Sequence, residues 1–188
     1  MSSLEITAEQ GRVLPPFARG VVEEGLGAAP ATELRGDWLE RPAATFVTLH
    51  LGGALRGCIG SIRPHRTLRD DLRSNALAAA FGDPRFPPLS VAEIERERLA
   101  VSVSVLSPLA RSAAASEAEL LASLVPGATG LLIEWRHTSA VFLPEVWEHL
   151  AEPARFLAEL KRKAGLPAGF WAHDLAAWTF SSRSWVDP

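Results

Sequence analysis

The sequence predicts an α+β fold with a mostly antiparallel sheet and flanking helices. Two pairs of segments are rich in β-branched and apolar residues, and a short turn joins the members of each pair. The pairs are residues 44–51 with 54–62 and residues 130–135 with 139–144. A further segment, residues 98–108, alternates strictly between apolar and small polar residues, as a half-buried strand does. Helical segments separate these strands without the regular alternation of a parallel, doubly wound sheet. Antiparallel hairpins with helices between them therefore define the class.

The N-terminal region is predicted to contain two helices. Thr7 and Gln10 have the spacing of a capping box, which starts the first one. The Pro15–Pro16 pair interrupts it, because a proline inside a helix removes a hydrogen bond and clashes with the preceding turn. A second helix begins at this pair and runs to Gly25 or Gly27.

The central region is predicted to form a hairpin followed by a helix. Gly52-Gly53 joins the two strands, since glycines accept the positive φ angles of a two-residue turn. The helix begins at Pro64 or Thr67 and stops at Gly82.

The remaining elements follow from capping and breaking residues. Residues 83–90 contain three prolines and are expected to form a shaped loop. Ser90 and Glu93 then have the spacing of a second capping box, for a short helix that ends near Arg96. After the 98–108 strand, we expect a helix over 117–124, the 130–144 hairpin, an amphipathic helix over 152–166 and a last strand over 175–185.

Composition excludes several classes of protein. The chain has 188 residues, 47% hydrophobic and 22% charged, which is typical of a soluble globular protein with a sizeable core. Its net charge of −3 provides no general attraction to nucleic acid or anionic membranes. We predict no metal or cofactor, because the histidines lack ligand spacing and no phosphate-binding loop is present. The absence of a signal peptide and of a membrane-length apolar run favours a cytoplasmic location.

The only cysteine of the chain lies in the second strand of the first hairpin. Residues two apart on a strand share a face, so Arg56 and Cys58 are expected to project together. An arginine beside a thiol favours the thiolate, which would make Cys58 a nucleophile or redox group. With a two-residue turn, however, Arg56 faces Leu49 and Cys58 faces Val47, an aliphatic setting in which cysteine packs as a small hydrophobe. The packed interpretation is favoured, and the reactive one stays open.

Four more residues are candidate ligand contacts. Gly57 and Gly60 lie inside a strand, which indicates a β-bulge or a close approach, either by another part of the chain or by a ligand. Asp83 and Arg85 stand beside Phe86 in the proline-rich loop. They form either an internal pair that fixes the loop or a polar pair that orients a small ligand.

Several motifs together resemble the AMMECR domain family, also called AmmeMemoRadiSam system protein A. The most recognisable is the hexamer LRGCIG at Leu55–Gly60, followed by DPRF at Asp83–Phe86. VSVL at Val103–Leu106 and KAGL at Lys163–Leu166 come next, in the order expected of the family. The similarity runs from about Leu14 to Trp178.

This resemblance implies one AMMECR-type domain over residues 1–188, with a larger lobe, a smaller lobe and a cleft between them near the hexamer. It also implies association with a Memo-like protein and a radical SAM protein, without a settled activity. One hypothesis is a small-molecule-binding component or enzyme of that system, with Arg56 and Cys58 at the ligand and Asp83 and Arg85 orienting it. The alternative is a non-catalytic scaffold that docks onto those partners. Whether the protein is an enzyme, which ligand it takes and its oligomeric state stay open.

Overall fold

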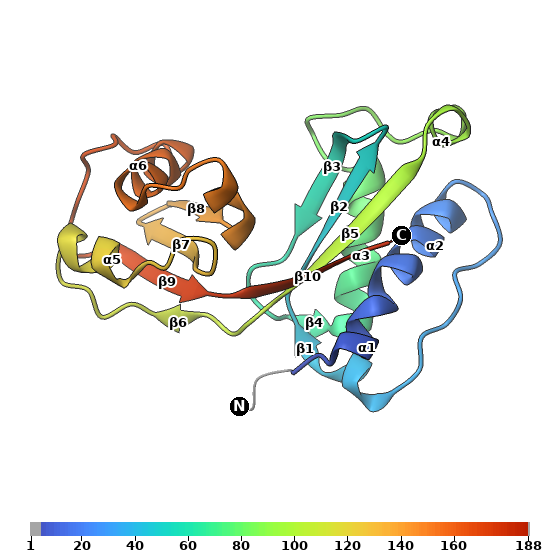
Figure 1. The fold of residues 1–188 in the computed structure, drawn as a ribbon, viewed down its shortest axis with the longest axis horizontal. Coiled ribbons are helices and arrows are strands. Elements are labelled where there is room, and N and C mark those ends of the chain that lie inside the picture. Colours follow the sequence, from blue (N-terminus) through green and yellow to red (C-terminus); the bar gives the residue numbers. More distant parts are fainter. Residues whose placement is uncertain (1–4, 188) are drawn as a thin grey trace. The chain divides into compact units, whose positions relative to one another are not determined.

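The computed structural model describes residues 5–187, so residues 1–4 and residue 188 of the predicted domain lie outside the described part (Figure 1). The chain divides into two compact units. The first comprises the described residues up to Leu106 together with those from Arg183 onward, and the second is Ser107–Ser182. Each unit has its own hydrophobic core.

The first unit begins with two consecutive helices, α1 (Ala8–Arg12) and α2 (Leu14–Gly25). The predicted capping box is present, because Gln10 N donates to Thr7 Oγ1 at 3.2 Å and Thr7 N donates to Gln10 Oε1 at 2.9 Å. The proline pair lies in the first turn of α2, where the missing N–H costs no helical hydrogen bond. The predicted interruption and restart of the helix are confirmed.

A four-stranded sheet is the centre of the first unit, in the strand order β10-β5-β2-β3. These strands are β2 (Thr45–Leu51), β3 (Ala54–Gly60), β5 (Leu99–Leu106) and β10 (Ser182–Val186). Both β3 and β5 run antiparallel to β2. The predicted Gly52-Gly53 turn joins β2 to β3 with φ angles of 54° and 86°.

Two helices pack on one face of this sheet. Helix α3 (Leu68–Phe81) covers β2 and β3, and α2 covers β5 and packs against α3 (Figure 1). Val47 and Leu49 of β2 are fully buried on this face, whereas Phe46 and Thr48 are half-buried on the other. The core of the first unit therefore lies between the helices and the sheet.

Short elements complete the first unit. They are η1 (Asp37–Glu40), β1 (Pro42–Ala43), β4 (Arg66–Thr67) and α4 (Val91–Arg96), with β1 antiparallel to β4. Thr67 caps the start of α3 and Gly82 its end, and the Ser90–Glu93 capping box begins α4. These helix ends agree with the predicted ones.

The second unit is built on an antiparallel sheet in the order β6-β9-β7-β8. Its elements are β6 (Ala110–Arg111), α5 (Glu117–Ser123), β7 (Gly130–Trp135), β8 (Thr138–Phe142), η2 (Pro144–Glu148), α6 (Pro153–Lys163) and β9 (Ala176–Phe180). Trp147 and Phe156 stack in its core with ring centroids 3.8 Å apart. The predicted single strand over 175–185 is wrong in one respect, because β9 joins this sheet and β10 joins the sheet of the first unit.

The observed class is α+β with antiparallel sheets flanked by helices, as predicted. Within residues 5–187, no helix has the length and apolar character needed to cross a membrane.

Candidate functional site

A β-bulge in the first hairpin decides the direction in which Cys58 points. The pairing of β2 with β3 shifts by one residue between Leu49 and His50, so Thr48, and not Val47, lies opposite Cys58. Because side chains alternate along a strand, this shift moves Cys58 from the helix-covered face to the other face. The predicted pairing of Cys58 with Val47 is therefore wrong.

Cys58 lies among polar neighbours on that face. Its side chain is half-buried, and the Thr48 hydroxyl donates a hydrogen bond to Cys58 Sγ at 3.2 Å. Ser102 of β5 lies opposite Thr48 on the next strand and is also half-buried. The sulfur is thus neither enclosed in the aliphatic core nor freely exposed.

Arg56 is buried and binds Glu93. Its Nε donates to Glu93 Oε1 at 2.7 Å, and its Nη2 donates to the Pro87 carbonyl oxygen at 2.8 Å. The guanidinium carbon lies 5.6 Å from the centre of the Phe86 ring, and Nη1 is a buried donor with no partner among the described residues. The expectation that Arg56 and Cys58 project together assumed regular alternation, which the bulge interrupts. Arg56 pairs with Glu93, and the bulge directs the Arg56 side chain away from that of Cys58.

Asp83 and Arg85 cover the open edge of β3 at Cys58. Since β3 is an edge strand, its outward N–H and C=O groups lack a neighbouring strand. Cys58 N donates to Asp83 Oδ2 at 2.9 Å, and Arg85 Nη2 donates to the Cys58 carbonyl oxygen at 3.3 Å. Arg85 also binds Asp83, with Nη2–Oδ2 and Nε–Oδ1 distances of 2.6 and 3.0 Å. Of the two alternatives stated for Asp83 and Arg85, the structure shows the internal pair. Both side chains also bind the backbone of Cys58 directly.

Both members of this pair stay charged. The Arg85 guanidinium, helped by the N–H groups of Cys58 and Arg85, holds the pKa of the buried Asp83 carboxyl well below its usual range. The pKa of Arg85 is raised, mainly by Asp83. The loop therefore places a charged guanidinium at Cys58 together with the carboxylate that pairs with it.

The two glycines of the hexamer are approached by the chain's own atoms. A Cβ placed on Gly57 would lie 2.1 Å from the Ala79 carbonyl oxygen of α3. A Cβ placed on Gly60 would lie 2.2 Å from the Phe46 ring. Tight packing, the first of the two alternatives, accounts for both positions.

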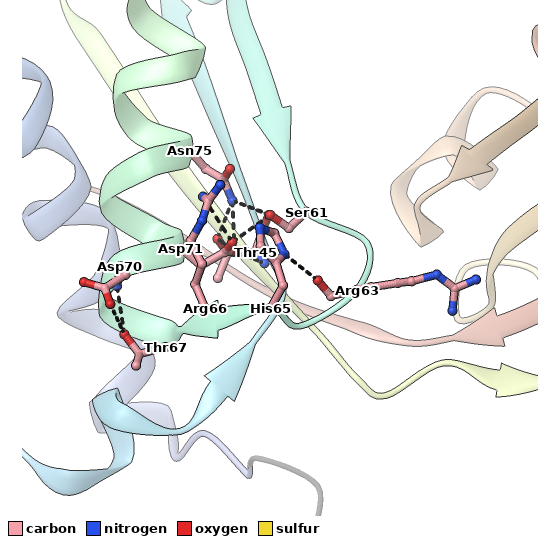
Figure 2. Close-up of polar contacts among 9 residues, drawn as sticks. All are labelled: Thr45, Ser61, Arg63, His65, Arg66, Thr67, Asp70, Asp71 and Asn75. Atoms are coloured by element: carbon pink, nitrogen blue, oxygen red, sulfur yellow. Dashed lines mark hydrogen bonds and ion pairs between the residues drawn. The ribbon is translucent and has the colours of Figure 1, made fainter.

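A buried polar network at the start of β2 was not predicted from the sequence (Figure 2). Asp71 is fully buried, and its Oδ2 accepts hydrogen bonds from Thr45 N at 2.9 Å, Thr45 Oγ1 at 2.8 Å and Asn75 Nδ2 at 2.9 Å. Its Oδ1 accepts from Ser61 Oγ at 2.6 Å and lies 3.8 Å from Arg66 Nη1. Each carboxylate oxygen has donors, so this network joins β2, the end of β3 and α3 structurally.

The signal for this network was present in the α3 segment. Asp71 and Asn75 are four residues apart and fall on the same helix face as the buried Leu68 and Leu72. Polar residues at inward positions of an amphipathic helix indicate a buried hydrogen-bonded cluster.

The site can support thiol chemistry and the binding of a polar ligand. Cys58 supplies a nucleophilic atom, Thr48 a hydrogen-bond donor to that atom, and Arg85 a cation. Between residues 5 and 187, no group of three His, Cys, Asp or Glu side chains has the arrangement of a metal site.

The Arg56–Glu93 pair predicts a dependence of stability on pH. The Arg56 guanidinium, together with hydrogen bonds from Ser90, lowers the pKa of Glu93 from 4.5 to about 2 against the effect of burial. A carboxyl whose pKa is depressed by folding stabilises the fold above pH 4.5, and this contribution is lost as the pH falls towards 2. We expect the denaturant midpoint to fall over this range, and to fall less in Glu93→Gln.

The neighbouring Glu95 provides the control for that experiment. Glu95 lies on the same helix and is exposed, so Glu95→Gln should keep the pH dependence of the unmodified protein. Equal pH dependence in Glu93→Gln and the unmodified protein would show that the ion pair contributes nothing to stability.

Comparison with known proteins places the chain in a family. The AMMECR1 family model matches residues 16–185. The chain belongs to the AMMECR1 family. A family relative from Methanothermobacter thermautotrophicus is 36% identical over 173 residues, covering 89% of this chain and 88% of the relative. A relative from Caldivirga maquilingensis is 37% identical over 174 residues, covering 87% and 78%.

A solved structure has the same fold. The crystal structure of an uncharacterized protein from Pyrococcus horikoshii aligns with a TM-score of 0.87 and 32% sequence identity. The alignment covers 97% of this chain and 93% of that protein.

Proposed function

We propose that this AMMECR1-family protein binds a small polar molecule at Cys58, as a ligand-binding component or enzyme. The observation that carries the proposal is the environment of the Cys58 sulfur. The sulfur is half-buried on the polar face of the sheet and accepts a hydrogen bond from Thr48. The carbonyl oxygen of the same residue binds the guanidinium of Arg85, which is paired with Asp83. Thiols that react or bind are partly accessible and lie in electropositive surroundings.

Arg85 is the residue suited to contact an anionic group of that molecule. Its side chain is 52% exposed, and its bonds to Asp83 and Cys58 use Nε and Nη2. Nη1 has no partner among residues 5–187, and a guanidinium retains N–H groups after binding one carboxylate. In this arrangement, Cys58 and Arg85 contact the ligand and Asp83 positions Arg85.

Alkylation with a charged and an uncharged reagent tests the proposal. The chain has one cysteine, so all alkylation reports on Cys58. Iodoacetate carries a negative charge and iodoacetamide does not. We expect Arg85→Gln to lower the ratio of the iodoacetate rate to the iodoacetamide rate by about threefold, the order of magnitude for the loss of one nearby unit charge in water.

Two variants make this experiment specific. Arg85→Lys should retain most of the rate ratio because it retains the charge. Arg96→Gln removes an exposed arginine of α4 and should leave the ratio unchanged. A ratio insensitive to Arg85→Gln, or a thiol that reacts only after unfolding, would overturn the proposal.

We further propose that the site operates in the cytoplasm together with a Memo-like protein and a radical SAM protein. The support for this association is the resemblance of the LRGCIG and DPRF motifs to those of the family. Within this chain, Cys58, Asp83 and Arg85 of these motifs form one connected cluster. A non-catalytic scaffold is the alternative, and the exposed Leu55 of the hexamer favours it as a docking residue. Co-purification separates the two: a scaffold loses its partners in Leu55→Ser, whereas a ligand site loses only system activity in Cys58→Ser.

A further inference from the structure

A cavity of about 380 Å³ lies within the second unit, between the segment that follows β6 and the loop that precedes β9. Its volume is in the range of small-molecule sites, about 300–1,000 Å³. The Ser112 N–H donates to the Ala177 carbonyl oxygen at 2.8 Å and joins the two segments. All of its lining residues belong to the second unit, so it is separate from the Cys58 site.

The lining carries an arginine and a histidine without an acidic residue. Arg111 and His173 both line the cavity and are exposed, and neither pairs with a carboxylate among the described residues. The acidic residues nearby in the sequence are engaged elsewhere. Asp174 accepts a hydrogen bond from Trp135 Nε1 at 2.9 Å, and Glu117 pairs with Lys161 at 2.9 Å.

This charge pattern favours an anionic ligand. A guanidinium binds a carboxylate or a phosphate through two parallel N–H bonds. A ligand anion at Arg111 would meet no fixed negative charge in the lining.

Trp171 provides an aromatic surface close to the buried Lys161. Lys161 of α6 is fully buried, and its Nζ donates to the Ala168 carbonyl oxygen at 3.3 Å. The same Nζ lies 5.9 Å from the centre of the Trp171 ring and binds Glu117. Lys161 therefore fixes the loop that carries Trp171 before any ligand arrives, which lowers the entropic cost of binding.

Small side chains leave space next to the indole. Ala113, Ala114, Ala176 and Ala177 line the cavity together with Leu175. These methyl groups and the indole ring form the apolar part of a lining that is otherwise polar, and this part is suited to a flat group, with the cation of Arg111 available to an acidic substituent.

We infer that this cavity is a second ligand site, which binds a small anion with a planar apolar body. The anionic group pairs with Arg111 and the planar body lies beside Trp171. Aryl carboxylates and aryl phosphates share this chemistry.

Titration of the full ¹⁵N-labelled chain with benzoate and with phenyl phosphate tests the inference. The chain has six tryptophans, and loss of one indole N–H signal in Trp171→Phe assigns the Trp171 signal. At least one probe is expected to shift that signal saturably, with a Kd in about the millimolar range for so small a ligand. The indole signals of Trp38 and Trp185, in the first unit, should not move.

Two variants and an uncharged probe separate the effect of the ligand's charge from the effect of the arginine's position. Arg111→Gln is expected to weaken binding of the anion about tenfold, since it removes a hydrogen bond between charged groups. Benzamide carries no charge, so it should bind the unmodified protein no more tightly than the anion binds Arg111→Gln. Arg155→Gln, which removes an exposed arginine of α6 in the same unit, should leave the affinity unchanged.

Saturable binding of either anion supports the inference. The anion that binds more tightly shows whether the acidic group of the ligand is a carboxylate or a phosphate. The inference is overturned if neither anion shifts the Trp171 signal saturably, or if Arg111→Gln and Arg155→Gln weaken binding equally. Cys58→Ser should bind the probes normally, so a failure here is distinguishable from a failure of the Cys58 proposal.

Discussion

Gly57→Ala is expected to lower the free energy of unfolding of the first unit by about 3 kcal/mol or more, the upper range for overpacked cores. The added Cβ would lie 2.1 Å from the carbonyl oxygen and 3.0 Å from the carbonyl carbon of Ala79. These are backbone atoms of α3, which cannot rotate away as a side chain can. The helix must instead move off the sheet, and this opens the core that the helix covers. Denaturant unfolding followed by circular dichroism measures the loss.

Substitutions at two other glycines provide comparisons for Gly57→Ala. A Cβ on Gly169 meets nothing within 4 Å, so Gly169→Ala should change stability by no more than about 0.5 kcal/mol, as for most surface substitutions. Gly60→Ala should fall between the two, because the obstructing atoms belong to the Phe46 ring, which can rotate. If Gly57→Ala is as mild as Gly169→Ala, the contact between β3 and α3 is not as tight as the structure indicates.

Local chemistry explains why the helix ends could be predicted from the sequence. Thr7 and Thr67 each accept a hydrogen bond from a backbone N–H three residues later, and the N–H of Ser90 donates to the Glu93 carboxylate. These bonds require nothing outside the helix and its cap. The Gly52-Gly53 turn is similarly local, since both residues adopt positive φ angles.

The register of β3 depends on distant residues and was not predicted, although the two glycines of the hexamer indicated a bulge as one alternative. A regular hairpin would pair Cys58 with Val47, and the bulge instead pairs it with Thr48. The shift aligns Gly57 with Leu49 on the face that contacts α3, and the buried Arg56 binds Glu93. These contacts join segments 20 to 40 residues apart, and no pattern within the hairpin reports them.

The candidate site residues were therefore named from the sequence, whereas the contacts among them were not. Asp83 and Arg85 were recognised as a pair, but their bonds to the N–H and C=O of Cys58 follow from the edge position of β3. The 175–185 segment shows the same limit, because its two halves join different sheets.

Asp71→Ala is expected to lower the free energy of unfolding by about 3–5 kcal/mol, because several buried donors lose their acceptor and each costs about 1–3 kcal/mol. These donors are the N–H and hydroxyl of Thr45, the amide of Asn75 and the hydroxyl of Ser61 (Figure 2). Thr45 is fully buried and Asn75 nearly so, and water cannot easily replace the carboxylate. Thermal and denaturant unfolding of the full chain measure the loss.

The adjacent Asp70 is a matched control for Asp71. It lies on the same helix turn but is exposed, and it accepts a hydrogen bond from the Thr67 hydroxyl at 2.8 Å. Asp70→Ala removes a favourable charge from the start of the helix, which costs about 0.3–1 kcal/mol. Asp71→Asn keeps one acceptor oxygen and loses the other, so its stability should lie between those of Asp71→Ala and the unmodified protein. If Asp71→Ala costs no more than Asp70→Ala, the network does not hold β2 and α3 together, and the buried carboxylate needs another explanation.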